Sequence, residues 1–594
     1  MTSKEIRKKF IDFFKKKKHK FTAPILLVPE NDPSLLFTNS GMVQFKEYFL
    51  GASKPVSKRM VNYQPCFRTI DLDKVGSNDR TLTFFEMLGS WSIGDYWKED
   101  AINFAWELLT NEFKFPAKKL WVTVFAGSKD VPADEESIGY WKKFLSDEKI
   151  IKLGVKDNFW IAGETGPCGP STEIYFDQGV NIGCREKDCK PGCDCDRFLE
   201  VWNAGVFMQY EKKLKTKNEK LKTNEYEYIP LKIKSVDTGA GLERLASVLQ
   251  DKDSVFEIDT IKPIYDKIVS SISSQKGSNS RVFKSIRVVC DHIRAAVFLA
   301  ADGIVPTNKT QGYVMRRLIR RMIVHGWLLG LKEGFTTQFA TLVIDIMRDL
   351  YPNLIKDKKT ILEIISKEDA NFTKTLVRGI KELNKIFNKK PKIIKGCDAF
   401  LLYDSYGFPI ELTTELAKEK NIKIDYLTFD KLMKEQQTRA RCSQQFMDKS
   451  INPKLHTATH LLHQALVDVL GNHVQQAGSN VSGNELRFDF THPDKLTDNQ
   501  KQKVEEIVND IIVKKLPVAY IETNVKDAKK QGAKALFSAK YGQKVKLYYI
   551  GKNLNSAYSK ELCGGPHIIN TSELGHLKIT SEKSSSSGIR RIKA

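Results

Sequence analysis

The chain has 594 residues, which predicts about three or four domains rather than one compact core. Hydrophobic residues make up 41% and charged residues 28% of it, and no apolar run approaches the roughly 18 residues that cross a bilayer, so we expect no membrane span. The net charge of +23 at pH 7 favours a polyanionic partner such as nucleic acid, although a lysine-rich proteome would give the same surplus.

The first predicted element is a basic amphipathic helix within residues 1–21. Phe10, Ile11, Phe13 and Phe14 fall on one face of this helix, and the segment lacks the apolar core and the cleavage site of a secretory signal. Half of the ten cysteines stand isolated in the sequence, unlike a disulfide framework. We therefore expect a protein of the reducing cytoplasm.

The patterns of apolar residues divide the chain into three predicted domains. Residues 1–250 mix short β-rich runs with Gly-rich turns, which predicts a domain built on a largely antiparallel sheet. Residues 251–449 show apolar spacings of three and four, as in a helical bundle. Residues 450–594 open with a helix and continue through the strand-like runs ELRFDF and KVKLYYIG. The expected fold class is multidomain α+β.

Three stretches of the first predicted domain are informative together. They read NDPSLLFTNSGMVQFKEYFLG, VNYQPCFRTIDLDKVGSNDRTLTFFEMLGSWSIGDYWK and VDTGAGLERLASVL. In these stretches, and through nearly all of its length, the sequence resembles the alanyl-tRNA synthetase family of class II aminoacyl-tRNA synthetases. The resemblance implies a class II catalytic domain with an antiparallel sheet, a helical tRNA-recognition domain and an α+β zinc editing domain.

Arginines in these stretches suit the joining of an amino acid to ATP. The attacking carboxylate is already ionised at neutral pH, so its reaction with the α-phosphorus depends on positioning and charge neutralisation. The resemblance implies that Arg68 holds the α-phosphate, Arg80 the β- and γ-phosphates and Arg244 the ATP tail, with Mg²⁺ bridging phosphate oxygens. A lone arginine is more often half of a surface ion pair, but three in these motifs favour the ATP role.

The predicted amino-acid pocket is small. The resemblance places Trp160, Asn203, Asp237 and Gly239 around L-alanine, with the carboxylate of Asp237 holding the ammonium group. The residues alone leave two alternatives open, which are core packing for Trp160 and capping of the following helix by Asp237.

The segment GCREKDCKPGCDCDRF contains a cluster of cysteines. Cys184, Cys189, Cys193 and Cys195 could enclose a structural zinc ion tetrahedrally. Their spacing differs from that of paired CxxC sites, so free thiols in a loop are the alternative.

The helical region contains a basic stripe. Arg316, Arg317, Arg320 and Arg321 form one face of a predicted helix that suits RNA phosphates, and a solvated amphipathic helix is the alternative.

Two further residues of this region carry an implied role in RNA recognition. In the family that the sequence resembles, an Asn in the loop before this helix and an Asp in a later LYD-YGFP motif read the G·U wobble pair of the acceptor stem. These positions fall on Asn308 and Asp404. An amide and a carboxylate can test the exocyclic amino group of a wobble guanine, whereas a turn residue and a helix cap are the structural alternatives.

Two pairs of predicted zinc ligands share one four-residue offset. KLHTATH places His456 and His460 on one helix face, and ELCGGPH supplies Cys563 and His567. No Glu follows His456, which argues against an HExxH protease. The segment resembles the editing domain of the family, which hydrolyses mischarged tRNA.

Discrimination between amino acids gives the reason for a second site. A pocket that holds alanine rejects serine or glycine by only about 1 to 3 kcal/mol, which is about 10- to 200-fold. We therefore expect ATP-dependent attachment of alanine to tRNA(Ala) through alanyl-adenylate, with hydrolysis of Ser-tRNA(Ala) and Gly-tRNA(Ala). The alternatives are a stand-alone trans-editing deacylase and a non-catalytic tRNA-binding protein. Retention of the ATP and amino-acid residues Arg68, Arg80, Asp237 and Arg244 speaks against the deacylase.

Typical relatives insert a small β-barrel before the editing domain and append a C-terminal domain, and neither is found in this sequence. We therefore expect a monomer, in which the large positive charge partly replaces the missing RNA contacts.

Overall fold

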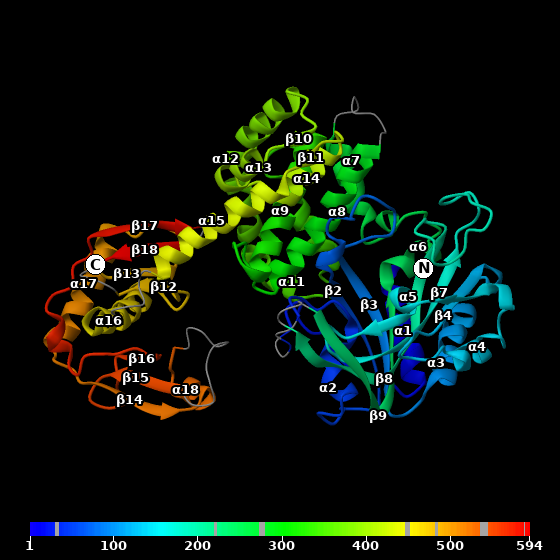
Figure 1. The fold of residues 1–594 in the computed structure, drawn as a ribbon, viewed down its shortest axis with the longest axis horizontal. Coiled ribbons are helices and arrows are strands. Elements are labelled where there is room, and N and C mark those ends of the chain that lie inside the picture. Colours follow the sequence, from blue (N-terminus) through cyan, green and yellow to red (C-terminus); the bar gives the residue numbers. More distant parts are fainter. Residues whose placement is uncertain are drawn as a thin grey trace. The chain divides into compact units, whose positions relative to one another are not determined.

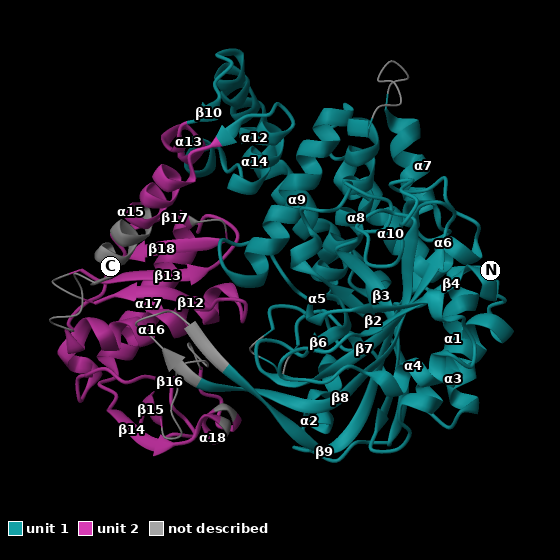
Figure 2. Ribbon diagram, turned by 45° about the vertical axis from the view of Figure 1, so that its right-hand side comes forward, with its two compact units in different colours: residues 1–394, 401–423 teal, residues 395–400, 424–594 magenta. Residues whose placement is uncertain are grey.

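The computed structural model describes residues 1–29, 32, 35–218, 223–272, 280–445, 452–481, 485–534, 545–586 and 588–594. The chain forms two compact units, which are coloured separately in Figure 2. Unit 1 contains residues 1–394 and 401–423, and unit 2 contains residues 395–400 and 424–594. The division into three domains at residues 250 and 449 stays a prediction, since the first two predicted domains lie mostly within unit 1.

The N-terminal part of unit 1 is built on one large sheet. Among the described residues, its order is β1-β2-β3-β9-β8-β7-β4-β5, with β6 paired to β7. The pairs β1–β2 and β4–β5 are parallel and the other pairs are antiparallel. The prediction of a largely antiparallel sheet is therefore confirmed. The strands are β1 (Lys20–Phe21), β2 (Arg59–Phe67), β3 (Phe84–Ile93), β4 (Leu120–Phe125), β5 (Ile150–Leu153), β6 (Phe159–Ile161), β7 (Gly166–Asp177), β8 (Phe198–Asn218) and β9 (Thr223–Gly241).

The predicted first helix is confirmed as α1 (Ser3–Lys16). Thr2 caps it in a capping box with Glu5, which satisfies free N–H groups of the first turn. Its aromatic face packs on the sheet. The ring centres of Phe10 and Phe14 lie 5.6 and 6.2 Å from that of Trp202 in β8. The other helices of this part are α2 (Lys46–Phe49), α3 (Lys98–Glu107), α4 (Glu135–Trp141), α5 (Val155–Asn158) and α6 (Leu242–Leu249).

Helices dominate the middle of the chain, as predicted. Every residue of α8 from 288 to 300 is buried, so this helix forms the centre of this part rather than an amphipathic cover. The elements are α7 (Lys262–Ser271), α8 (Ser280–Ala301), α9 (Thr310–Leu329), α10 (Phe335–Met347), α11 (Asn353–Lys356), α12 (Lys358–Asn388), β10 (Ile393–Ile394), α13 (Gly396–Tyr406), α14 (Ile410–Lys418), β11 (Lys423–Ile424) and α15 (Tyr426–Gln445). No helix among the described residues is both long and apolar enough to span a bilayer.

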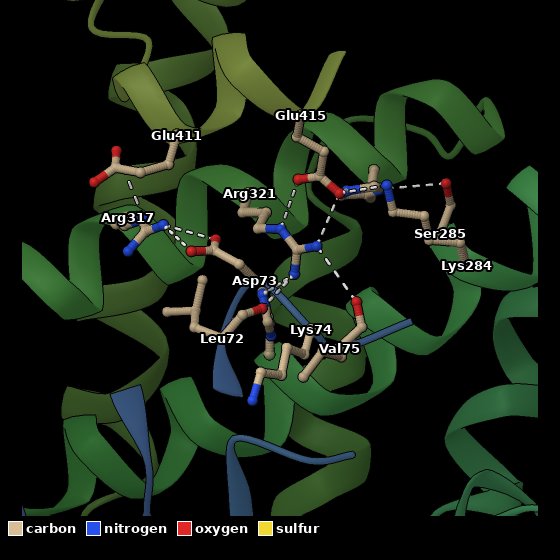
Figure 3. A network of polar contacts seen from close by, with 12 residues as sticks. Leu72, Asp73, Lys74, Val75, Lys284, Ser285, Arg317, Arg321, Glu411 and Glu415 are labelled. Carbon is tan, nitrogen blue, oxygen red and sulfur yellow. Dashed lines mark hydrogen bonds and ion pairs between the residues drawn. The ribbon is translucent and has the colours of Figure 1, made fainter. Parts of the chain in front are cut away.

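A buried arginine joins the helices of unit 1 to the loop between β2 and β3. Arg321 of α9 donates to both carboxylate oxygens of Glu415 in α14, at 2.8 and 2.9 Å (Figure 3). The same guanidinium donates to the backbone carbonyls of Leu72 and Val75, at 2.9 and 3.4 Å. Burial raises the pKa of Glu415, but the neighbouring imidazole of His325 and the hydrogen bonds from Arg321 outweigh this effect and hold it well below its usual range.

Further contacts hold the same loop, residues 69–83. Arg317 donates to both oxygens of Asp73 at 2.6 and 2.8 Å, and the backbone N–H of Thr83 donates to Asp291 of α8 at 2.8 Å. Gly76 has a φ of +88°, and a Cβ there would lie 2.8 Å from the backbone carbonyl of Lys284. The loop therefore lies directly against α8 and α9.

Unit 2 contains two antiparallel sheets, in the orders β12-β13-β18-β17 and β14-β15-β16 among its described residues. In Figure 1, α16 runs between the two sheets. Leu461 of α16, Phe488 of β13 and Val504 of α17 belong to one buried cluster. The elements are α16 (Pro453–Leu470), β12 (Gln476–Asn480), β13 (Arg487–Thr491), α17 (Asp498–Val513), β14 (Val518–Thr523), α18 (Val525–Lys530), β15 (Val545–Ile550), β16 (Ser559–Leu562), β17 (Ser581–Ser586) and β18 (Ile589–Lys593).

Removal of Arg321 tests how much the junction between α9, α14 and the loop of residues 69–83 stabilises unit 1. In Arg321→Met, the carboxylate of Glu415 loses its bidentate partner in a buried site, so we expect the free energy of unfolding of unit 1 to fall by about 3 to 5 kcal/mol. Arg317→Met is the matched control on the same helix. Its partner Asp73 has a side chain that is 63% exposed, so the expected loss is about 1 kcal/mol or less. Urea unfolding of both variants measures the difference, and equal losses would contradict this assignment.

Candidate functional site

One cavity of about 560 Å³ opens over the large sheet of unit 1. All seven residues predicted to bind ATP or the amino acid line it, although they come from separate stretches of the sequence. They are Arg68, Arg80, Trp160, Asn203, Asp237, Gly239 and Arg244. The fold therefore places the arginines and the small-pocket residues at a single site.

Two of the three arginines are anchored at the end of β2 and in the loop that follows. The Nε of Arg68 donates to the carbonyl of Asn39 at 3.1 Å, and its guanidinium lies 5.0 Å from the ring centre of Phe85. Arg80 donates to the carbonyls of Cys195 and Asp194, at 2.5 and 2.9 Å. Each guanidinium has five N–H donors, so both keep donors for a phosphate.

The third arginine lies in the first turn of α6. Arg244 donates to the carbonyl and to the carboxylate of Glu200, at 3.1 and 2.8 Å, and its side chain is 30% exposed. Its neighbour Glu243 is buried, where Arg294 of α8 donates to it at 2.7 Å. Arg294 and Glu200 were missed by sequence reasoning, because nothing in their local sequence indicates a partner this distant in the chain.

The predicted amino-acid pocket contains a buried acid. Asp237 is only 5% exposed, and the indole Nε1–H of Trp91 donates to it at 2.6 Å. Burial raises the pKa of Asp237 to about 7 in spite of this hydrogen bond. Asp237 lies in β9 and the N-cap of α6 is Gly241, so the alternative of a helix cap is excluded. A bound cation beside Asp237 would favour its ionised form.

Trp160 and Gly239 complete the wall of this pocket. Trp160 is half-buried in β6 and packs against a cluster of buried apolar residues that includes Phe45. It therefore contributes to the core and lines the cavity as well. A Cβ at Gly239 would lie 2.8 Å from the sulfur of Met87, so any larger residue there requires that side chain to move.

Asn203 contacts an acid that sequence reasoning missed. Its amide Nδ2 donates to Glu173 Oε1 at 3.3 Å, and the hydroxyl of Tyr175 donates to Glu173 Oε2 at 2.7 Å. Burial and the neighbouring Glu200 raise the pKa of Glu173 to about 8. The carbonyl oxygen of Asn203 is buried and has no hydrogen-bond partner among the described residues.

The four clustered cysteines lie close enough to share one ion. Their sulfur atoms all lie within 4.8 Å of one another, with Cys184 and Cys193 at 3.9 Å and Cys189 and Cys195 at 3.5 Å. These separations suit a tetrahedral site with Zn–S bonds of about 2.3 Å. Burial raises the pKa of Cys195, but hydrogen bonds from the backbone N–H groups of Cys184 and Arg197 outweigh this effect and lower it to about 7. Burial raises the pKa of Cys189 above its usual range, so Cys195 is the thiol that loses its proton more readily.

The second predicted ligand set converges in unit 2. The ligand atoms of His456, His460, Cys563 and His567 all lie within 4.8 Å of one another. Cys563 Sγ lies 3.2 Å from His456 Nε2, and His567 Nε2 is buried without a hydrogen-bond partner among the described residues. Burial lowers the pKa of His456 to about 4 and that of His567 to about 2, which keeps both imidazoles neutral, as ligands must be.

Hydrogen bonds fix the orientation of two of these rings. His456 Nδ1 lies 3.1 Å from the carbonyl oxygen of Pro566, and His567 Nδ1 lies 3.1 Å from the hydroxyl of Thr457. Such contacts on the far nitrogen are typical of metal-binding histidines. Glu561 is fully buried nearby, 3.7 Å from His460 Nε2, and was not predicted.

The predicted RNA contacts lie in the helical part of unit 1. Asn308 is exposed in the loop before α9, and Asp404 is exposed inside α13 rather than at its N-terminus, where a helix cap would be. Arg316 lies with its guanidinium 5.8 Å from the ring centre of Tyr313. Arg317 pairs with Asp73, so an RNA phosphate would have to share or replace that partner.

The other two arginines of the stripe bind acceptors within the protein. Arg320 donates to Glu368 and to the carbonyl of Gly407, at 2.7 and 2.6 Å. Arg321 is buried, as described above, so a fully solvated helix face does not describe this segment.

Comparisons with known proteins identify the family of the chain. Residues 5–504 match the family described as tRNA synthetases class II (A), and residues 545–593 match the second additional domain of threonyl and alanyl tRNA synthetases. The chain is 44% identical to a protein of Borrelia garinii subsp. bavariensis, over 100% of this chain and 99% of that one. It is 42% identical to one of Treponema pallidum, over 99% and 97%.

A third relative is longer. The chain is 37% identical to a protein of Caldicellulosiruptor saccharolyticus, over 100% of this chain and 79% of that one. All three relatives are named Alanine--tRNA ligase. With a family match over most of its residues and relatives aligned along its whole length, the chain belongs to the alanine–tRNA ligase family of class II tRNA synthetases.

Proposed function

We propose that this protein joins L-alanine to ATP, forms alanyl-adenylate and transfers the alanyl group to tRNA(Ala). One observation carries the proposal, which is that three arginines and a small pocket with a buried acid line a single cavity. An ATP tail needs cations, and an amino acid needs an anion for its ammonium group. The cavity supplies both the cations and the anion, so ATP and the amino acid could bind side by side in it.

The arginines would act on the phosphates. In-line attack of the alanine carboxylate on the α-phosphorus moves negative charge onto the departing pyrophosphate, so fixed cations lower the barrier. Arg68 would meet the α-phosphate, Arg80 the β- and γ-phosphates and Arg244 the tail. When bound with ATP, Mg²⁺ supplies further charge neutralisation, and the carboxylate of Glu200 on the cavity wall is an oxygen ligand of the kind it prefers.

The pocket around Asp237 would select the amino acid. An ammonium group beside the buried carboxylate forms an ion pair with little competition from water. Trp160, Asn203 and Gly239 would limit the side chain of the substrate to about the size of a methyl group. Such a pocket admits serine and glycine as errors, because single small groups change binding by only about 1 to 3 kcal/mol.

The second proposed activity is removal of these errors in unit 2. His456, His460, Cys563 and His567 would hold a zinc ion, which supplies a Lewis-acid centre for binding the ester end of mischarged tRNA. The orphaned Nε2 of His567 and the neutral state of the histidines support this assignment. The four clustered cysteines of unit 1 would hold a second, structural zinc ion.

The remaining expectations concern RNA and cell location. Asn308 and Asp404 are proposed to read the G·U pair of the acceptor stem, with Arg316 and Arg317 beside them on phosphates. The cysteines among the described residues are free, which supports a reducing cytoplasm. The monomeric state stays a prediction from the sequence.

Alanine-dependent ATP–pyrophosphate exchange tests the main proposal and separates it from a trans-editing deacylase or a non-catalytic RNA-binding protein. Alanine binding requires ionised Asp237, whose raised pKa is about 7. We therefore expect kcat/KM for alanine to fall about tenfold for each pH unit below about 7, since the charged form of an acid is lost below its pKa. Asp237→Asn should remove this dependence and raise the alanine KM about 100-fold. A wild-type profile that is flat down to pH 5.5 would refute this role of Asp237.

A mischarging assay tests the editing proposal. Cys563→Ala removes a proposed metal ligand, so we expect about one zinc ion fewer per chain by mass spectrometry and accumulation of Ser-tRNA(Ala) in the presence of serine and ATP. Alanine-dependent exchange in unit 1 serves as the internal control and should persist. Unchanged zinc content with normal clearance of Ser-tRNA(Ala) would overturn the assignment.

A further inference from the structure

Asn203 and Glu173 face each other across two neighbouring strands. Thr172 of β7 pairs with Gly205 of β8, but the next residue, Glu173, pairs with Asn203, so Ala204 is left without a partner. This extra residue is a β-bulge, a feature that redirects side chains beside active sites. The bulge brings the amide of Asn203 to the carboxyl group of Glu173 on the wall of the cavity.

The amide of Asn203 has two different sides, of which one is already used. Its NH₂ group donates to Glu173 Oε1 at 3.3 Å, while its carbonyl oxygen is buried and has no partner among the described residues. A buried acceptor without a hydrogen bond is costly, and Asn203 lines the cavity, so a donor on the ligand would satisfy this oxygen. The ammonium group of an amino acid is such a donor, whereas an amide turned the other way would present N–H groups to a cation.

We infer that Glu173 is a positioning residue for amino-acid activation, which holds the amide of Asn203 so that its carbonyl oxygen faces the ammonium group of alanine. The inference rests on the proposed alanine-activating function. It adds a second acceptor to the carboxylate of Asp237, which lines the same cavity.

Tyr175 makes this arrangement independent of the charge on Glu173. The tyrosine hydroxyl lies 2.7 Å from Glu173 Oε2, and a hydroxyl can donate to a carboxylate or accept from a carboxylic acid. In both states the other oxygen, Oε1, remains an acceptor for the amide of Asn203. The NH₂ group of Asn203 is therefore always drawn away from the ammonium site.

Two substitutions of Glu173 separate positioning from general damage. Glu173→Met keeps an unbranched side chain of similar length but removes the acceptor, so we expect the alanine KM to rise about 10- to 100-fold, the range for a lost hydrogen bond to a charged group. Glu173→Gln can hold the amide in either orientation. We expect about half of the molecules to be competent, and the alanine KM to rise only about twofold. The KM for ATP should change less than twofold in both variants.

The decisive measurement is a double-mutant cycle in alanine-dependent ATP–pyrophosphate exchange. In the Asn203→Ala background, Glu173→Met should have no further effect on the alanine KM, because the group that it positions is gone. Additive effects of the two substitutions on the alanine KM would overturn the inference. Parallel increases in the KM values for alanine and ATP would overturn it as well. If the wild-type protein shows no exchange, the proposed function itself fails, and the two failures are thus distinguished.

Discussion

The interaction on which the rest of unit 1 depends is the burial of the Arg321 guanidinium against Glu415 and the loop carbonyls. A charge removed from water costs several kcal/mol unless its partners are in place, so the arginine is tolerated only when α9, α14 and the loop come together. The loop runs from the end of β2 to the start of β3, and Arg80 lies in it. One buried cation thus links the packing of the helices to the position of Arg80, which we propose binds a phosphate.

A second contact extends this link to the other side of the cavity. Arg294 of α8 holds Glu243, the residue before Arg244. Helices α8 and α9 therefore support two separate arginines of the cavity, at Arg80 and Arg244, from outside the sheet. This explains why unit 1 is one compact body although its N-terminal part is a sheet and its remainder is helical. It also suggests a physical role for residues that look like RNA contacts in the sequence.

The sequence predicts those features that depend on local pattern or on motif. The antiparallel sheet follows from short β-rich runs between Gly-rich turns, and the first helix follows from its apolar periodicity. The convergence of His456 with Cys563 follows from two motifs with the same offset. Arg317 and Arg321 show where this reasoning ends. They belong to a basic stripe in the sequence, but Arg321 is buried and pairs with Glu415. Because Glu415 lies on another helix, far along the chain, the local sequence does not indicate this pairing. Glu173 escaped notice for a related reason, since its role depends on a bulge in the neighbouring strand that no local pattern marks.

Hydrogen–deuterium exchange of the ligand-free protein tests the central claim, which is that the helices hold the loop of residues 69–83, with Arg80 in it, in place. The backbone N–H groups of Val75 and Thr83 are hydrogen-bonded within this junction. The account predicts that peptides covering residues 69–83 exchange with opening free energies close to those of α9, and that Arg321→Met lowers both together. Exchange of these loop amides within seconds, while α9 stays protected, would contradict it.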